Sequence, residues 1–170
     1  HQGAHYRVRG PLDTARPPQG RPPLMVSGEV GDLAAATAEV LHTTPRHLAE
    51  ARQARAAIAQ RLAAHGRSPD ALRVLPGVAP DDAVVCDGPM RLAETPTMIA
   101  SIMQEWHARG AADGFIIHLP DTPATIASFA GELMTALRQR GLRDAMPASA
   151  SLRDRLGLAP APSRHAVGVA

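Results

Sequence analysis

The sequence predicts an α/β domain built on a parallel sheet, because helix-like and strand-like segments alternate along it with marked boundaries. The clearest unit runs from Thr95 to Pro120. Pro96 suits the first helical position, since it lacks the N–H that would be unpaired there. Gly110 can end the helix in a left-handed conformation, and the short apolar run 115–119 is typical of a strand buried on both faces. The apolar residues of this helix recur at i, i+3, i+4 and i+7: Ile99, Ile102, Met103 and Trp106.

The residues before this unit contain three further strands and two helices. Residues 1–23 are rich in proline and glycine and read as a connection, with a short edge strand at 5–8. The predicted strands are 24–27, 39–42 and 72–78. The predicted helices are 33–38, capped by Asp32, and 44–66, opened by Thr44-Pro45 and closed by Gly66.

The residues after it predict a third long helix and a short one. The long helix is 122–141, opened by Thr122-Pro123 and closed by Gly141, and the short one is 151–158. Residues 79–94 show no helical period. We therefore expect one domain over 1–158 and a flexible tail over 159–170.

Composition excludes several classes of function. The net charge is only +2, acidic residues are interspersed among the basic ones, and aromatic residues make up 2% of the chain. These values do not favour nucleic-acid binding. The lone Cys86 suits a reducing compartment, and there is no apolar run of about 18 residues that would span a membrane. We expect a cytoplasmic protein.

Two histidines are candidates for a substrate pocket. His42 and His118 close predicted strands, and ligands of parallel α/β proteins bind at the carboxyl ends of strands. A histidine there can exchange a proton near neutral pH or simply hydrogen-bond to a neighbouring loop. No residue at a recognisable spacing completes a catalytic triad or a metal site, so we assign no catalytic residue and no metal ligand.

The turn from Ser27 to Gly31 is a candidate phosphate site. It joins a strand to a helix N-terminus, where unpaired N–H groups favour an anion, although Glu29 opposes one. It matches neither the P-loop nor the dinucleotide fingerprint. One reading of the chain is therefore a small doubly wound domain that binds a phosphorylated ligand here.

A series of short motifs resembles the luciferase-like flavin monooxygenases, in the branch of the nitrilotriacetate, dibenzothiophene sulfone and long-chain alkane monooxygenases. In order, these motifs lie at 10–12, 18–20, 22–26, 33–40, 66–70, 75–78, 95–96, 99–100, 112–115, 140–142 and 151–158.

The resemblance implies a (β/α)8 TIM barrel of which this chain is the C-terminal half, about the last four βα units. It also implies reduced FMN supplied by a separate flavin reductase, activation of dioxygen at the flavin, and oxygenation of a small organic substrate. Ser27 and Gly28 match the family's phosphate-binding turn and are the expected FMN-binding residues. The family's long insertion before the Thr95-Pro96 helix is reduced here to 79–94.

Two hypotheses follow from this resemblance. The first is a C-terminal fragment or truncated homologue of an FMN-dependent two-component monooxygenase, inactive until it meets its missing N-terminal half. The second is a non-catalytic half-barrel, a binding or assembly module that pairs with a second copy or with another chain to cover its open sheet edges.

Overall fold

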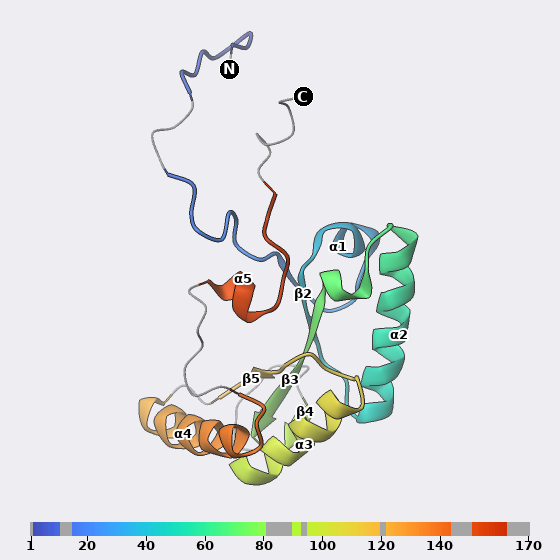
Figure 1. Cartoon of the computed structure of the whole chain (residues 1–170), viewed down its shortest axis with the longest axis vertical. Helices are drawn as coiled ribbons and strands as arrows, with labels where there is room; N and C mark the ends of the chain where they lie inside the picture. Colours follow the sequence, from blue (N-terminus) through green and yellow to red (C-terminus); the bar gives the residue numbers. More distant parts are fainter. Residues whose placement is uncertain are drawn as a thin grey trace.

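The computed structural model describes residues 2–10, 15–80, 90–92, 95–119, 122–143 and 151–162. These residues form a five-stranded sheet flanked by helices (Figure 1). The strand order is β1-β2-β3-β4, and β5 pairs with β3. Every strand pair among the described residues is parallel, which confirms the predicted α/β fold with a parallel sheet. Cys86 and residues 81–89, 93 and 94 lie outside the described residues.

The first half of the chain builds one core cluster. Its elements are β1 (Met25–Ser27), α1 (Asp32–Thr37), β2 (Val40–Thr43), α2 (Leu48–Ala64), the 3-10 turn Pro69–Ala71 and β3 (Arg73–Pro80). Ala35 of α1, Leu41 of β2 and Leu62 of α2 are almost fully buried in this cluster. The sequence predicts each of these helices and strands to within a few residues.

The second half builds another cluster on the same sheet. The elements of this half are β4 (Met90–Leu92), α3 (Pro96–Ala108), β5 (Ile116–Ile117), α4 (Pro123–Gln139) and α5 (Leu152–Arg155), and the cluster contains residues of all of them except α5. The start of α3 is confirmed, since Thr95 Oγ1 accepts a hydrogen bond from Met98 N at 3.4 Å. Its end is confirmed too, because Gly110 has a φ of 65°. Ile99 and Leu133 are buried where α3 and α4 meet.

Several local predictions are wrong. The helix expected from Thr44 begins instead at Leu48, because the Nδ1 of His47 accepts the N–H of Glu50 at 3.2 Å and so caps it. The N-cap of α1 is Gly31, and Asp32 is the first residue of that helix. β4 was not predicted, and β5 is only partly buried because no described strand pairs with its second edge.

All four longer packing helices lie on one face of the sheet. Side chains alternate between the two faces of a strand. On β3, Val74 belongs to the cluster with α1 and α2, and Val78 to the cluster with α3 and α4. These positions have the same parity, so both helix pairs cover the same face. The strand residues that face these helices are Val26, Leu41, Val74, Val78 and Ile117. Their neighbours along the strands point to the second face: Met25, Ser27, Val40, His42, Leu75, Ile116 and His118.

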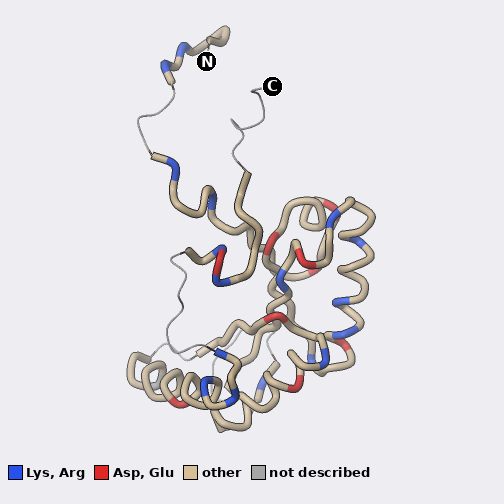
Figure 2. The backbone as a smooth tube through the Cα atoms, viewed as in Figure 1, with Lys and Arg blue, Asp and Glu red and all other residues tan. Residues whose placement is uncertain are grey.

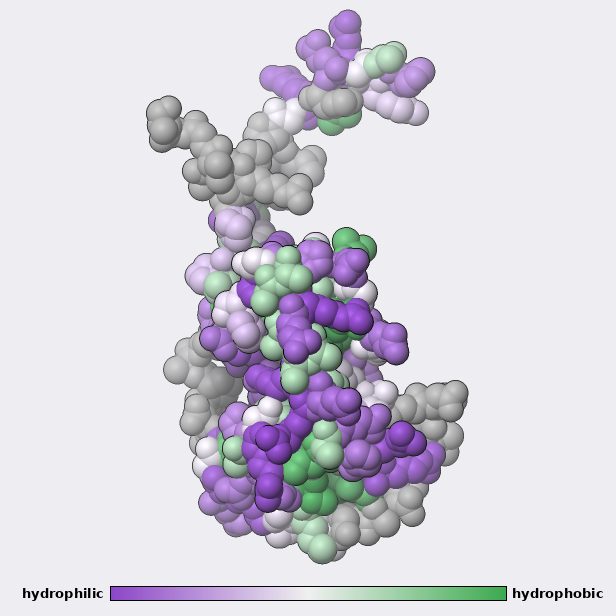
Figure 3. Space-filling view, turned by 90° about the vertical axis from the view of Figure 1, so that its right-hand side faces the viewer, coloured by the Kyte–Doolittle hydropathy of each residue, from purple (hydrophilic) through white to green (hydrophobic). Residues whose placement is uncertain are grey.

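This arrangement differs from a doubly wound domain, in which helices cover both faces of the sheet. Figure 3 shows the side of the molecule that lies at the right of Figure 1, where hydrophilic residues predominate and apolar residues appear in both the upper and the lower part of the body. In the described part of the chain, no helix has the length and apolar character needed to cross a membrane.

A buried ion cluster ties α5 to the amino-terminal end of the sheet. Arg153 is 2% exposed and donates to both carboxylate oxygens of Glu39, at 2.7 and 3.0 Å. Arg21 donates to the same two oxygens at 2.8 and 3.0 Å. The hydrogen bond from Arg153 is the largest cause that lowers the pKa of Glu39 to about 2. The cluster also reaches the predicted tail, since Arg153 donates to the carbonyl oxygen of Ala159 at 3.1 Å.

The N-terminal segment extends away from the sheet (Figures 1 and 2). Residues 2–10 are all exposed, and the edge strand expected at 5–8 is present only as an isolated bridge between Gln2 and Arg7. Figure 2 shows basic and acidic residues mixed over the body of the molecule. The extended segment carries Arg7 and Arg9 and no acidic residue.

Candidate functional site

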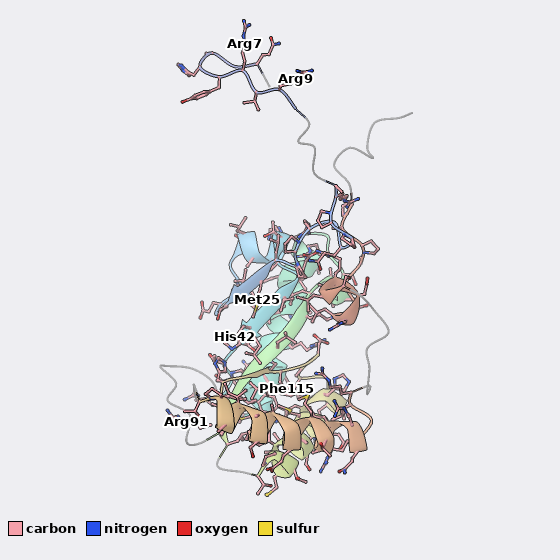
Figure 4. The ribbon with its side chains drawn as sticks, turned by 90° about the vertical axis from the view of Figure 1, so that its left-hand side faces the viewer. Arg7, Arg9, Met25, His42, Arg91 and Phe115 are labelled. Atoms are coloured by element: carbon pink, nitrogen blue, oxygen red, sulfur yellow. The ribbon has the colours of Figure 1, made fainter. Side chains whose placement is uncertain are left out.

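Three polar residues picked out in the sequence meet at the carboxyl ends of the strands. Ser27 ends β1, His42 lies near the end of β2, and His118 directly follows β5. All three occupy the second face of the sheet. In Figure 4, Met25 of β1 and His42 of the neighbouring strand β2 lie near each other, and Arg7 and Arg9 lie far from both. The structure thus brings the candidate FMN-binding and substrate-pocket residues into one site.

The turn after β1 is held by His42. Ser27 and His42 are in register on neighbouring strands, and Ser27 Oγ lies 2.9 Å from His42 Nδ1. The N–H of Gly28 donates to the carbonyl oxygen of His42 at 3.1 Å. Gly28 has a φ of 95°, a conformation that favours glycine, and open space surrounds its Cα. His42 therefore fixes the path of the chain at Ser27-Gly28.

The two histidines lie side by side. Their ring centroids are 5.4 Å apart and the rings are tilted by 36°. Both Nε2 atoms are buried, and neither has a hydrogen-bond partner within the described part of the chain. Burial, followed by the neighbouring His118, lowers the pKa of His42 below its ordinary value. His42 is therefore a neutral imidazole at pH 7, able to donate or to accept one hydrogen bond through Nε2.

The fit of this turn to a flavin phosphate depends on the Ser27 hydroxyl. The N–H of Gly28 is already used, and α1 is only six residues long with Asp32 in its first turn. The hydroxyl of Ser27 can accept the Nδ1–H of His42 and still donate its own hydrogen to a phosphate oxygen. Ser27 therefore fits the group, while Gly28 leaves space for it to approach.

A cavity of about 450 Å³ lies directly behind this turn. It is bordered by Gly28 and Glu29 on one side and by Thr43 and Arg61 on the other. Arg61 donates to the carbonyl oxygen of Val30, so this guanidinium also fixes the loop between β1 and α1.

A second cavity, of about 420 Å³, lies away from the histidines between α3, α4 and the start of β5. Asp113 borders it and accepts two hydrogen bonds from Arg55, both at 2.8 Å, and one from the N–H of Val74 at 2.8 Å. Burial alone would raise the pKa of Asp113, but these donors lower it below its ordinary value. Asp113 is thus a structural link between α2, β3 and β5.

Comparison with known proteins agrees with this architecture. The Luciferase-like monooxygenase family profile matches residues 1–81. N-acetyl-S-(2-succino)cysteine monooxygenase of Bacillus subtilis is 26% identical over 98% of this chain and 56% of its own length. Nitrilotriacetate monooxygenase component A of Aminobacter aminovorans is 28% identical over 94% of this chain and 53% of its own. A pristinamycin IIA synthase subunit of Streptomyces pristinaespiralis is 36% identical over 100% of this chain and 46% of its own.

Solved structures show the same fold. EDTA monooxygenase from Chelativorans superposes with a TM-score of 0.75 at 20% identity, over 94% of this chain and 56% of that one. Long-chain alkane monooxygenase superposes with a TM-score of 0.72 at 18% identity, over 92% of this chain and 50% of that one. Riboflavin lyase, solved with modified FMN and riboflavin, superposes with a TM-score of 0.70 at 18% identity, over 92% of this chain and 52% of that one. The chain spans about half the length of the relatives it matches.

The alignments also differ in length. The match to the Bacillus relative runs over 249 positions, although this chain has 170 residues, so that relative contains internal segments without a counterpart here. The match to the pristinamycin synthase protein runs over 170 positions and contains the whole chain, so it needs no such segment.

Two features of the site were not predicted. The contact between Ser27 and His42 could have been predicted, because short connections set neighbouring strands in register. The pairing of His42 with His118 could not, since β3 lies between their strands and the distance depends on the twist of the sheet.

Proposed function

We propose, from its homology to luciferase-like monooxygenases, that this chain is the C-terminal half of an FMN-dependent two-component monooxygenase acting on a small organic substrate. Reduced FMN would come from a separate flavin reductase, in the cytoplasm. The observation that carries the proposal is the coverage of one sheet face alone by α1 to α4, in a chain that matches about half of each relative. A (β/α)8 barrel places its helices outside and its second sheet face inside.

Within this proposal the three polar residues have separate roles. The hydroxyl of Ser27 donates to the flavin phosphate while it accepts the Nδ1–H of His42, and Gly28 leaves room for the phosphate to approach. His42 and His118 lie next to each other on the second face of the sheet, which this proposal places inside the barrel, where the substrate would bind. The bound reduced flavin supplies the activation of dioxygen, so the chain itself needs no catalytic nucleophile or metal.

The partner in this proposal is a polypeptide with the remaining βα units. The outer edge of β1 and the second edge of β5 have no pairing strand among the described residues, and such edges bind other strands. Leu24 is 45% exposed and Met25 is 53% exposed at the β1 edge, as expected for apolar side chains that the other half would cover. A pristinamycin IIA synthase made of two separate polypeptides is among the homologous systems.

The alternative function is a non-catalytic assembly module in which two copies pair through the same edges. The exposed Met25 and Leu24 favour it as well, because a second copy would also bury them. The first proposal requires FMN binding by the two halves together, whereas the assembly module requires none.

Flavin fluorescence measured on the chain combined with a co-expressed amino-terminal half tests the first proposal. Ser27→Ala should weaken FMN binding by about tenfold, since it removes a donor to a charged phosphate, and Ser27→Thr should retain most of the affinity. Equal affinities of the three proteins for FMN would exclude Ser27 from the phosphate site. A stable homodimer that leaves FMN fluorescence unchanged with or without the other half would support the assembly module.

A further inference from the structure

We propose that His42 and His118 together bind a carboxylate group, each imidazole donating one hydrogen bond through its Nε2–H. The two rings come from β2 and from the end of β5, and they meet on the second face of the sheet. The inference requires only the geometry of these side chains, and it concerns the chain without bound flavin.

The main evidence is a pair of buried nitrogen atoms that lack partners. Both Nε2 atoms are inaccessible to solvent, and the described residues provide no hydrogen-bond partner for either. A buried polar atom without a partner is unfavourable, and such atoms in folded proteins are rare outside binding sites and ordered-water sites. The two unpartnered nitrogen atoms belong to adjacent rings whose centroids are 5.4 Å apart. This proximity points to one ligand that engages both rings.

A metal ion does not suit this pair. Transition metals held by histidine need three or more protein ligands, as in zinc sites. No group of three or more His, Cys, Asp or Glu side chains that could hold a metal occurs in the described part of the chain. Ser27, the polar side chain bonded to His42, is a poor metal ligand in its neutral form.

A carboxylate does suit the pair, because it presents two acceptor oxygens side by side. Ser27 Oγ contacts the Nδ1 of His42 at 2.9 Å. When the hydroxyl donates its hydrogen to Nδ1, the ring carries its own hydrogen on Nε2 and becomes a donor. A cation would instead require bare Nε2 atoms on both rings. Ser27 therefore acts as a positioning residue that sets the tautomer of His42 for an acceptor ligand.

The inference also specifies the substrate if the proposed function holds. The substrate of the flavin-loaded protein would then carry a carboxylate, held on the inside of the barrel by the Nε2–H of His118. The same Ser27 hydroxyl could not donate both to the flavin phosphate and to His42. When FMN is bound, His42 would take the Nδ1–H tautomer, leaving His118 as the remaining Nε2–H donor.

The test uses sodium acetate as the probe and the full chain without flavin. Imidazole ¹⁵N and ¹H resonances are followed by NMR during a titration, with sodium chloride and acetamide as matched controls. We expect saturable shifts of the Nε2 signals of His42 and His118 with acetate and no saturable shift with either control. Unshifted histidine signals, or equal shifts with acetamide, would overturn the proposal.

Matched variants separate ligand binding from structural damage. His42→Gln keeps an amide near the position of Nε2, whereas His42→Asn keeps one near Nδ1, beside Ser27. We expect His42→Asn to weaken acetate binding by about tenfold, and His42→Gln to weaken it less. The control His65→Gln alters an exposed residue at the end of α2 and should leave the affinity unchanged. Equal losses in the Gln and Asn variants, with the backbone spectra unchanged, would contradict the role of Nε2.

Failure of this test and failure of the proposed function are distinguishable. Acetate binding is measured on the chain alone and by its histidine signals, while the proposed function depends on FMN fluorescence with the other half present. A chain that binds acetate but never FMN would keep the inference and refute the oxygenase proposal.

Discussion

Replacement of Arg153 by methionine should destabilise the chain strongly. Methionine keeps much of the volume of Arg153 but leaves the carboxylate of Glu39 with the N–H of Leu24 and with Arg21, which is 43% exposed. Four hydrogen bonds are lost, to the two oxygens of Glu39 and to the carbonyl oxygens of Ala159 and Arg21. Removing one partner of a buried ion pair costs about 3–5 kcal/mol, a large part of the stability of one domain.

The pH dependence of unfolding gives an independent estimate of the same cluster. The pKa of Glu39 falls from 4.5 to about 2 in the folded chain. A carboxylate with a lowered folded pKa stabilises the fold above its unfolded pKa and loses this contribution as the pH falls toward the folded value. The shift corresponds to about 3 kcal/mol, lost between about pH 4.5 and pH 2.

The assay is urea unfolding followed by circular dichroism, at neutral pH and through the acid range. Arg153→Met should lower the free energy of unfolding by about 3–5 kcal/mol and flatten its acid dependence. The double variant with Glu39→Gln should lose less than the sum of the single variants, because the unpaired charge is gone. A loss below about 1 kcal/mol in Arg153→Met would refute the reasoning that α5 is anchored by this buried pair.

Three further outcomes are expected. Asp113→Asn should lower the free energy of unfolding by about 2–4 kcal/mol, because its charged hydrogen bonds weaken, and chemical denaturation measures this loss. His118→Gln should raise the pKa of His42 in an NMR titration, since a neighbouring charge is removed, although burial keeps that pKa below its ordinary value; an unchanged pKa would exclude coupling of the rings. Gly110→Ala should destabilise by about 1 kcal/mol because of its positive φ, whereas Gly131→Ala within α4 should stabilise by a similar amount; thermal unfolding of both variants checks the difference in sign.

The sequence predicts elements well where local chemistry decides them. Thr95-Pro96 caps α3 as expected, because both the hydroxyl acceptor and the proline act within a single turn. Thr44-Pro45 has the same residues, yet the next helix begins later, since His47 provides a competing cap. Local signals therefore identify a helix more reliably than its first residue.

Features that depend on tertiary pairing could not be predicted. β4 is three residues long, too short to show a period, and it exists because Val78 to Pro80 of β3 pair with it. The expectation that 115–119 is buried on both faces was wrong: these residues are partly exposed, because the described helices pack on one face of the sheet and β5 has a single pairing strand among the described residues.

The candidate site was predicted as separate residues and not as an arrangement. The rule that strand ends carry ligands identified Ser27, His42 and His118. Their convergence depends on the parallel order of the strands and on their shared parity. Parity also places the packing helices on the other face, and this is the structural basis for proposing half of a barrel.

The most direct test of the half-barrel proposal is an FMN fluorescence titration of three samples: this chain, a polypeptide with the other βα units, and the two together. The account predicts saturable binding only in the combined sample, with a mass equal to one copy of each half. Equally tight binding of FMN by this chain alone would contradict it.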